Sequence, residues 1–461
     1  MRSLDDGGLR SNTAITPPIT DLDYSFISPQ TGKIGAWTST PGCTTVDPYA
    51  DKLNLDMLRK YQSQGVKVLM TIGGWTLSQH LSTFANDPAL LASLVKSCVD
   101  YMNGVGQAKD GLDGFRFNGI DIDWEFPVTG GDGGNARNPA DGRNFVKMID
   151  DFRTAMGSGS VLTVAAPPTP CMIGFTNCPN IAADPNTSSL AFTDQPAPTS
   201  HAPIVDWSAL TTGADPKLNF VNVMAYDYNG SGWSNLTNED APLFSNPSDP
   251  SAANGFNVNE TVQLYLKAGI PARRLVLGVP YYGYYYGQVN NNNPACATNA
   301  NCSLFQSFLG RTMPSGPYSG QSTIPFSGIM GLKSNDGVMA EDPVFAKVTN
   351  VVQPVGTADN ACYGGWTCNL DPDTDVSNIY AGYSSGYDNP VGSGNNTGVY
   401  WSYDNSQAMQ YKSGYAACDG LGGVMIFDMT FDPSGSLWNG LEWPMMPPQL
   451  QGKCSSALWP K

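Results

Sequence analysis

Basic residues and histidine are scarce in this sequence of 461 residues. Lysine and arginine number 24 against 40 acidic residues, and the resulting net charge of −16 disfavours nucleic acids and anionic membranes as partners. His80 and His201 are the only histidines, so we expect neither a histidine-centred catalytic triad nor a His-rich zinc site. No apolar run approaches the roughly 18–20 residues of a transmembrane helix. We therefore expect no contact with nucleic acid or membrane.

Charged residues make up only 14% of the chain, whereas Gly, Pro, Asn, Ser and Tyr are plentiful. This composition is typical of a loop-rich secreted protein, and we expect an extracellular monomer. Residues 1–8 contain no apolar core segment of a signal peptide, so we expect that a signal has been removed or that the chain starts late.

Ten cysteines include three pairs that are close in sequence, namely Cys171/Cys178, Cys296/Cys302 and Cys362/Cys368. A zinc site would favour shorter C-x₂₋₄-C spacings. Disulfides that staple Gly/Pro/Asn-rich loops are the better interpretation, and they fit an oxidising compartment. The spacing leaves four cysteines unassigned: Cys43, Cys98, Cys418 and Cys454.

Predicted strands and helices alternate along the chain. Apolar runs predict strands at 22–27, 66–72, 119–126, 161–166, 218–228, 274–279 and 422–427. Helical periodicity predicts helices at 53–64, 88–102, 145–156, 261–268 and 407–417. The alternation favours a parallel α/β architecture. No Gly-rich phosphate loop follows an early strand, which argues against a doubly wound nucleotide-binding fold. Polar residues gather at strand ends, as in a barrel.

The most informative segment is Asn118-Gly-Ile-Asp-Ile-Asp-Trp-Glu-Phe-Pro127. In a strand, Asp121, Asp123 and Glu125 share one face, an arrangement that is costly unless the carboxyls are paired or protonated. Neighbouring carboxyls push their pKa values apart, which provides one protonated and one ionised group near neutral pH. A solvated edge strand is disfavoured by the alternating Ile and Trp. A calcium loop is disfavoured because Phe126 and Asn135 occupy the positions that require Gly and Glu.

This segment resembles the D-G-x-D-x-D-W-E-Y-P signature of glycoside hydrolase family 18, the chitinases and their relatives, with Asn118 in place of the first acid. Further similar motifs are Thr71-Ile-Gly-Gly74, Met224-Ala-Tyr-Asp227, Gly278-Val-Pro-Tyr-Tyr-Gly283 and Gly422-Gly-Val-Met425. The resemblance extends from about residue 20 to residue 443.

The resemblance implies a (β/α)8 TIM barrel whose first strand is missing or atypical, because 22–27 resembles the second strand of the family. Such a barrel has an open edge unless residues 1–19 or another segment fill the gap. It also implies an α+β insertion lobe between strands 7 and 8. The expected domains are an irregular segment at 1–19, a barrel at 20–285 and 399–445, a lobe at 286–398, and a tail at 446–461.

The resemblance also implies a retaining mechanism in which the 2-acetamido group of the substrate is the nucleophile. Glu125 is then the general acid. Asp123 orients the acetamido group and stabilises the oxazolinium ion. Asp121 shares a proton with Asp123 and relays it towards Glu125. No metal or organic cofactor is implied.

Other residues are expected to bind the sugar. Tyr226 is expected to hydrogen-bond the acetamido carbonyl, with Asp227 and Met224 lining the same subsite. Stacking on sugar rings is expected from Trp75 and Tyr282. Two departures from the family lie nearby: Phe427 stands where the family has a Trp, and Tyr284 where it has an Arg.

The expected activity is therefore cleavage of β-1,4-linked N-acetylglucosamine polymers, with chitin or chito-oligosaccharides as substrate. Two alternatives stay open. One is an endo-β-N-acetylglucosaminidase that acts on N-glycans, although the insertion lobe favours the long groove of a chitinase. The other is a chitinase-like lectin that binds sugar without cleaving it. Such lectins usually lose the catalytic Glu, which is intact here as Glu125.

Overall fold

The structure, a computed structural model of the chain, describes thirteen stretches of residues. These are 21–28, 42–45, 48–107, 111–174, 203–246, 249–290, 304–313, 319–326, 368–370, 383–385, 398–404, 406–428 and 431. They fall into two compact units. Unit 1 lies within Thr13–Val223 and Gln263–Leu275, and unit 2 within Met224–Val262 and Val276–Lys461.

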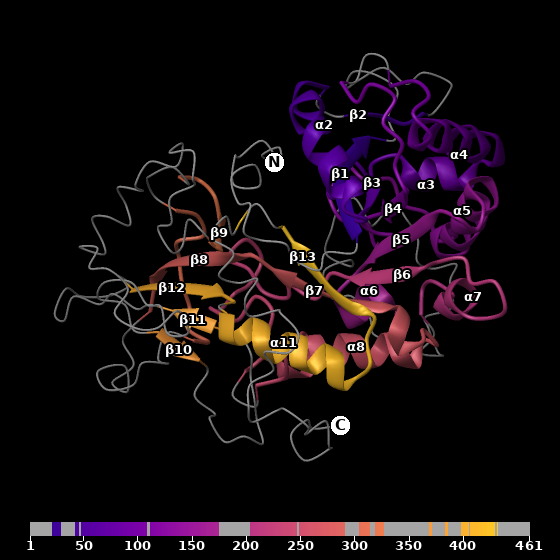
Figure 1. Cartoon of the computed structure of the whole chain (residues 1–461). Coiled ribbons are helices and arrows are strands. Elements are labelled where there is room, and N and C mark those ends of the chain that lie inside the picture. The colour runs from indigo at the N-terminus through magenta and orange to yellow at the C-terminus, as the bar shows by residue number, and fades with distance from the viewer. Residues whose placement is uncertain are drawn as a thin grey trace. The chain divides into compact units, whose positions relative to one another are not determined.

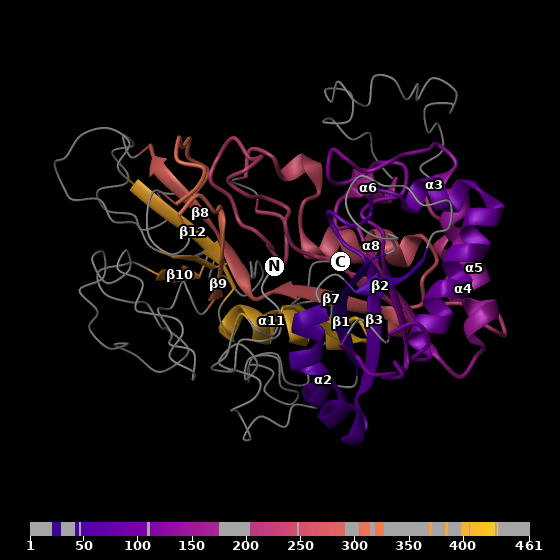
Figure 2. The ribbon, with the colours of Figure 1, turned by 90° about the horizontal axis from the view of Figure 1, so that it is seen from above.

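Unit 1 is built on parallel strands that follow one another in the order β6-β5-β4-β3-β1, with the short β2 antiparallel to β1 (Figure 1). The strands are β1 (Asp21–Ser28), β2 (Thr44–Thr45), β3 (Lys67–Gly73), β4 (Gly119–Asp123), β5 (Val161–Ala166) and β6 (Phe220–Val223). The helices are α2 (Pro48–Ser63), α3 (Leu81–Asn86), α4 (Pro88–Met102), α5 (Asp141–Met156), α6 (Pro170–Ile173) and α7 (Trp207–Thr211). Helices α3, α4 and α5 pack against one another (Figure 2).

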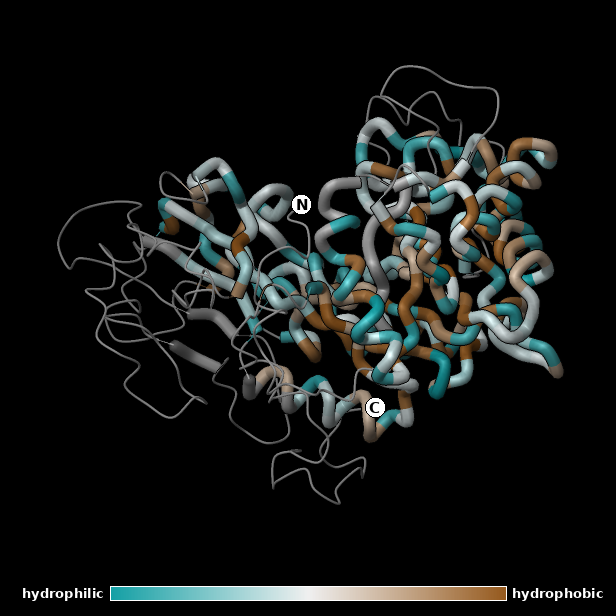
Figure 3. Tube along the Cα trace, turned by 45° about the horizontal axis from the view of Figure 1, so that its top comes forward, coloured by the Kyte–Doolittle hydropathy of each residue, from teal (hydrophilic) through white to brown (hydrophobic). Residues whose placement is uncertain are grey.

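The core of unit 1 follows from the sequence pattern. The near-continuous apolar run of β3 is buried from Val68 onwards, as expected for a strand covered on both faces. Helix α5 is amphipathic and buries Phe145, Met148, Ile149 and Phe152, which recur at spacings of three and four residues. Hydrophobic stretches run through the interior of this unit (Figure 3).

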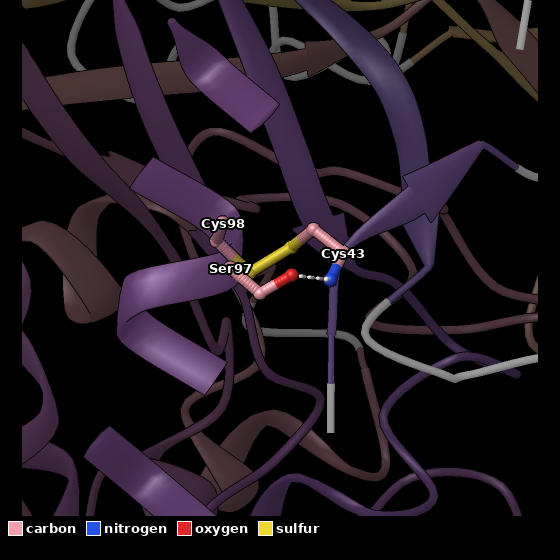
Figure 4. The surroundings of a disulfide bond; sticks show 3 residues. All are labelled: Cys43, Ser97 and Cys98. Atoms are coloured by element: carbon pink, nitrogen blue, oxygen red, sulfur yellow. Dashed lines mark hydrogen bonds between the residues drawn. A yellow bond between two sulfur atoms is a disulfide. The ribbon is translucent and has the colours of Figure 1, made fainter. Parts of the chain in front are cut away.

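A disulfide closes a large loop in unit 1. Cys43 is bonded to Cys98 of α4, 55 residues further along the chain, and the backbone N–H of Cys43 donates a 3.0 Å hydrogen bond to Ser97 Oγ (Figure 4). The sequence left both cysteines unassigned. The three predicted local pairs lie at least partly outside the described residues.

Unit 2 combines two kinds of sheet. Strands β7 (Leu275–Pro280) and β13 (Gly423–Phe427) pair in parallel. A separate antiparallel sheet has the order β10-β11-β12-β8-β9 (Figure 1). Its strands are β8 (Tyr282–Val289), β9 (Thr323–Pro325), β10 (Cys368–Leu370), β11 (Tyr383–Ser385) and β12 (Gly398–Tyr403), and helix α11 (Ser406–Cys418) leads into β13. Between β6 and β7 the chain forms 3-10 turns at Ala252–Asn254 and Ala272–Arg274, and helix α8 (Val258–Lys267).

Every predicted strand and helix is found in the structure, but two strands are shorter than expected. Strand β4 ends at Asp123 rather than at residue 126, and β6 covers 220–223 rather than 218–228. Beyond the carboxyl end of each strand, the backbone N–H groups of Glu125 and Asp227 bond to loop residues instead of to neighbouring strands. The sequence also did not predict β8 as a strand. The expectations for residues 1–19 and 446–461 lie outside the described residues.

None of the helices in the described part of the chain is both long and apolar enough to cross a membrane.

Candidate active site

Asp121 lies in the middle of β4, between strands β3 and β5. The strand registers place it opposite Thr71 on β3 and Thr163 on β5. Its side chain is buried, and its Oδ1 accepts hydrogen bonds from Thr163 Oγ1 at 2.6 Å and Asn222 Nδ2 at 3.4 Å. Burial raises the pKa of Asp121 to about 6, against the opposing effect of these donors. The carboxyl can therefore hold or release a proton close to neutral pH.

Asp123 ends β4 and is only 7% exposed. Its carbonyl oxygen accepts hydrogen bonds from the backbone N–H of Gly74 at 2.7 Å and from Ser78 Oγ at 3.2 Å. Because these partners belong to the loop after β3, the chain leaves the sheet here. The same close approach requires glycine at position 73: its φ is +109°, and a Cβ there would overlap the Asp123 carbonyl.

Glu125 follows the strand end and is partly exposed. Its backbone N–H donates to Ser78 Oγ at 3.0 Å, and its carbonyl accepts from Asn135 Nδ2 at 2.8 Å. The peptide bond to Phe126 is cis. Contacts from two loops thus hold the Glu125 backbone beyond the carboxyl end of β4, with its side chain accessible to solvent.

Trp75 lies in the loop after β3, directly behind Gly74, and it is 51% exposed. Asn135 Nδ2 donates to the Trp75 carbonyl at 3.2 Å and so ties it to the Glu125 segment. Gly131 lies against the indole, since a Cβ there would come within 3.1 Å of two of its ring atoms. An exposed, backed indole of this kind has the properties of a stacking surface.

Unit 2 contains the remaining predicted site residues. Met224 and Tyr226 follow β6 directly and are buried. Asp227 is exposed and adopts a left-handed backbone with φ of +58°. Its Oδ1 accepts two phenolic hydrogen bonds, from Tyr282 at 2.6 Å and Tyr284 at 2.7 Å. Although its accessible surface is that of an exposed residue, desolvation by the groups packed around it raises the pKa of this carboxyl, and the two phenols oppose that rise.

Phe427 ends β13 and is partly exposed. Its ring stacks on that of Tyr226, with centroids 6.1 Å apart and planes 24° apart, and meets Tyr282 edge-on at 6.4 Å. Tyr226 and Tyr282 are also in edge contact at 6.1 Å. These three rings and Asp227 form one contiguous group in unit 2.

The predicted residues therefore gather in two groups. Asp121, Asp123, Glu125 and Trp75 belong to unit 1, and the five others to unit 2. The tyrosine-rich segment 281–286 is mostly a packing element, since all five of its tyrosines are buried, Tyr282 among them. In the part of the chain that the structure describes, no three His, Cys, Asp or Glu side chains gather so as to hold a metal ion.

Sequence reasoning missed several supporting residues. Thr163 and Asn222 contact Asp121, Ser78 and Asn135 hold the Glu125 backbone, and Asp240 holds that of Asp227. A polar residue inside an otherwise apolar strand is a usable signal, because a buried hydroxyl needs a partner. Thr163 shows this signal within 161–166. The loop residues show none.

Comparison with known proteins places the chain. The sequence is 26% identical over 412 residues to Chitinase A1 of Niallia circulans, covering 87% of this chain and 46% of that protein. It is 32% identical over 240 residues to Chitinase 1 of Aphanocladium album, covering 50% of this chain and 44% of the relative. The chain thus spans less than half the length of either relative.

Solved structures resemble it in fold. The Group IV chitinase of Ostrinia furnacalis in complex with allosamidin has a TM-score of 0.60 at 19% identity, covering 95% of this chain and 91% of that one. Catalytic domain 2 of the Group II chitinase of the same organism, in complex with penta-N-acetylchitooctaose, has a TM-score of 0.60 at 20% identity, covering 89% and 82%. The fold is the expected (β/α)8 barrel. A sequence model of "Glycosyl hydrolases family 18" matches residues 6–432, and the chain belongs to that family.

Proposed function

We propose that the protein is a chitinase-type glycosidase that hydrolyses β-1,4-linked N-acetylglucosamine polymers with retention of configuration. One observation carries the proposal. In a family 18 chain, the accessible Glu125 stands just past the carboxyl end of β4, which buries Asp121 and Asp123. Catalytic residues of barrel enzymes come from this end of the strands.

The chemistry begins with proton transfer from Glu125 to the glycosidic oxygen. As the bond from C1 to that oxygen breaks, the carbonyl oxygen of the substrate's own 2-acetamido group bonds to C1 and forms an oxazolinium ion. Water then attacks C1 and gives its proton to the Glu125 carboxylate, which restores the acid. Two inversions at C1 leave the configuration unchanged.

Asp123 and Asp121 have electrostatic roles in this scheme. The oxazolinium ion is positively charged, and a fixed carboxylate at Asp123 stabilises it without reorganisation. Asp121 holds a proton that the pair shares, which fits its pKa of about 6. Relay of that proton towards Glu125 helps to keep the general acid protonated.

The group in unit 2 binds the sugar. Tyr226 donates to the acetamido carbonyl, and Asp227 and Met224 line the same subsite. Phe427 supplies the apolar floor, with Tyr282 beside it. Trp75 provides an aromatic surface for stacking on a sugar ring. The relatives named chitinases, and the neighbour solved with penta-N-acetylchitooctaose, support chitin or chito-oligosaccharides as the substrate class.

The protein is secreted and acts as a monomer. The Cys43–Cys98 disulfide supports an oxidising compartment. We place the barrel at 20–285 and 399–445, with a substrate-groove lobe at 286–398. Antiparallel strands β9, β10 and β11 within this span favour such a lobe.

The test is release of reducing ends from N-acetylglucosamine oligomers by the wild type, Glu125→Gln and Glu260→Gln. Loss of the general acid lowers kcat by about 10²–10⁴-fold. Glu260 lies exposed in the first turn of α8, so its isosteric change is the matched control and keeps full activity. Proton NMR of fresh products should show the β-anomer first. A folded wild type that binds oligomers without cleaving them would refute the enzyme and identify a lectin.

A further inference from the structure

Asp240 is a buried carboxyl whose partners among the described residues belong to unit 2, and it has no part in the proposed catalytic steps. It is 2% exposed. Its Oδ1 accepts the backbone N–H of Asp227 at 2.7 Å, and its backbone carbonyl accepts that of Tyr228 at 3.0 Å. Next to it, the Glu239 carbonyl accepts Asn229 Nδ2 at 2.9 Å. Residues 239–240 therefore hold three consecutive residues of the turn that carries Asp227.

That turn needs an external hold. A residue with a side chain rarely adopts a left-handed backbone such as the φ of +58° at Asp227, although Asp tolerates it better than most. The Asp227 N–H has left the β6 ladder, because the strand ends at Val223. The Asp240 carboxyl provides the acceptor that the ladder no longer offers.

Asp240 is in turn anchored to the antiparallel sheet that supplies the tyrosines. Its backbone N–H donates to Ser402 Oγ on β12 at 2.7 Å. Ser402 pairs in register with Tyr284 on β8, and the Tyr284 hydroxyl donates to Asp227. A closed circuit of contacts thus runs from Asp227 through Asp240 and β12 to β8 and back to Asp227.

We propose that Asp240 is a positioning residue for sugar binding: its Oδ1 locks the Asp227 turn onto the β8–β12 sheet and so orients the Asp227 carboxyl towards the bound sugar. This role rests on the proposed function, in which Asp227 lines the acetamido subsite. The role depends on the position of the Asp240 Oδ1 acceptor and not on the charge of the carboxyl. Oδ2 has no hydrogen-bond partner among the described residues, and the buried Lys412 pairs with Asp404.

The electrostatic surroundings agree with a neutral Asp240. Burial raises the pKa of this carboxyl, as do the nearby Asp227 and Asp404 carboxyls, while the Asp227 N–H and Lys412 oppose the rise. Asparagine at 240 would keep an oxygen acceptor of the same shape without charge. The Asn variant is therefore the conservative rescue, and the Ala variant removes the acceptor.

The experiment measures Kd for tetra-N-acetylchitotetraose by calorimetry, and KM and kcat on the same oligomer, for Asp240→Ala, Asp240→Asn and Asp249→Ala. We expect Asp240→Ala to raise Kd and KM about tenfold, since it leaves the Asp227 N–H without its acceptor, and an unsatisfied donor costs about that factor. Its kcat should change less, and Asp240→Asn should stay within about twofold of wild type. Asp249→Ala is the matched control: Asp249 holds Ser251 and Asn238 in the same loop, so its loss lowers Tm without changing Kd.

A double-mutant cycle separates positioning from general damage. If Asp240 acts through Asp227, the double variant that carries both Asp227→Ala and Asp240→Ala should bind the oligomer no more weakly than Asp227→Ala alone. Ser402→Ala, which removes the anchor, should weaken binding in the same direction, and it carries the test if Asp240→Ala does not fold.

Three outcomes would overturn the inference: wild-type Kd in Asp240→Ala, a Kd in Asp240→Asn as weak as in Asp240→Ala, or full additivity in the cycle. A wild type that neither binds nor cleaves the oligomer overturns the proposed function first. A wild type that binds without turnover leaves the Kd comparison valid.

Discussion

Replacing Thr163 by Val tests the electrostatics of the buried acid in β4. The change is nearly isosteric and removes the hydroxyl that donates to Asp121 Oδ1 at 2.6 Å. A hydrogen bond to a charged group is worth about 1.5–3 kcal/mol, and 1.4 kcal/mol corresponds to one pKa unit. Because this donor favours the ionised carboxyl, its loss should raise the pKa of Asp121 by at least about one unit above its present value of about 6.

Linkage fixes the sign of the effect on stability. A carboxyl whose folded pKa lies above its ordinary 3.8 contributes stability below pH 3.8, and this contribution is lost as pH rises through the folded pKa. In the wild type this loss amounts to about 3 kcal/mol. In Thr163→Val the pKa of folded Asp121 is higher, so this loss of stability continues to higher pH. The amount by which the variant's unfolding free energy lies below that of the wild type should therefore grow by about 1.5 kcal/mol between pH 4 and pH 8.

Urea unfolding at pH 4, 6 and 8 measures this, with two controls. Thr163→Ser keeps the hydroxyl and should follow the wild-type pH dependence. Thr211→Val removes a buried hydroxyl that donates to the Trp207 carbonyl at 2.8 Å, so its cost should not depend on pH. The alkaline limb of the pH profile of kcat/KM should also move to higher pH in Thr163→Val, because Asp121 keeps its proton up to a higher pH. A deficit of the same size at all three pH values would refute the reasoning.

Two further predictions concern the sugar floor and the disulfide. Phe427→Ala should raise KM for chito-oligosaccharides about tenfold, because it removes the apolar ring that stacks on Tyr226. Phe427→Trp should lower KM because its aromatic face is larger. Equal KM values for all three proteins in steady-state assays would contradict this. Replacing Cys43 and Cys98 by Ser opens a loop of 55 residues and should lower the unfolding free energy by about 4 kcal/mol, with kcat/KM unchanged at 25 °C. An unchanged urea midpoint would show that the unfolded chain of this double variant gains no entropy from the opened loop.

The sequence determined much of the architecture, because the relevant signals are local. Apolar runs and helical spacings placed every strand and helix that was predicted, including α5 with its buried face. The alternation of Ile and Asp in β4 placed Asp121 in a strand next to the core. One segment, 118–127, also carried enough motif to suggest the family. Such features depend only on residues that are neighbours in the chain.

The tertiary structure decided the ends of the strands and the partners of the acids. Strand β4 stops at Asp123 because Gly74 and Ser78, some 45–50 residues earlier, take its carbonyl oxygen, and no local pattern encodes that contact. Thr163 contacts the Asp121 carboxyl, and Asp240 contacts the turn at Asp227, only after distant strands and loops have packed. The pairing of Cys43 with Cys98 likewise depends on where α4 lies. Hydrogen bonds between residues far apart in sequence are set by packing, and packing depends on the whole chain.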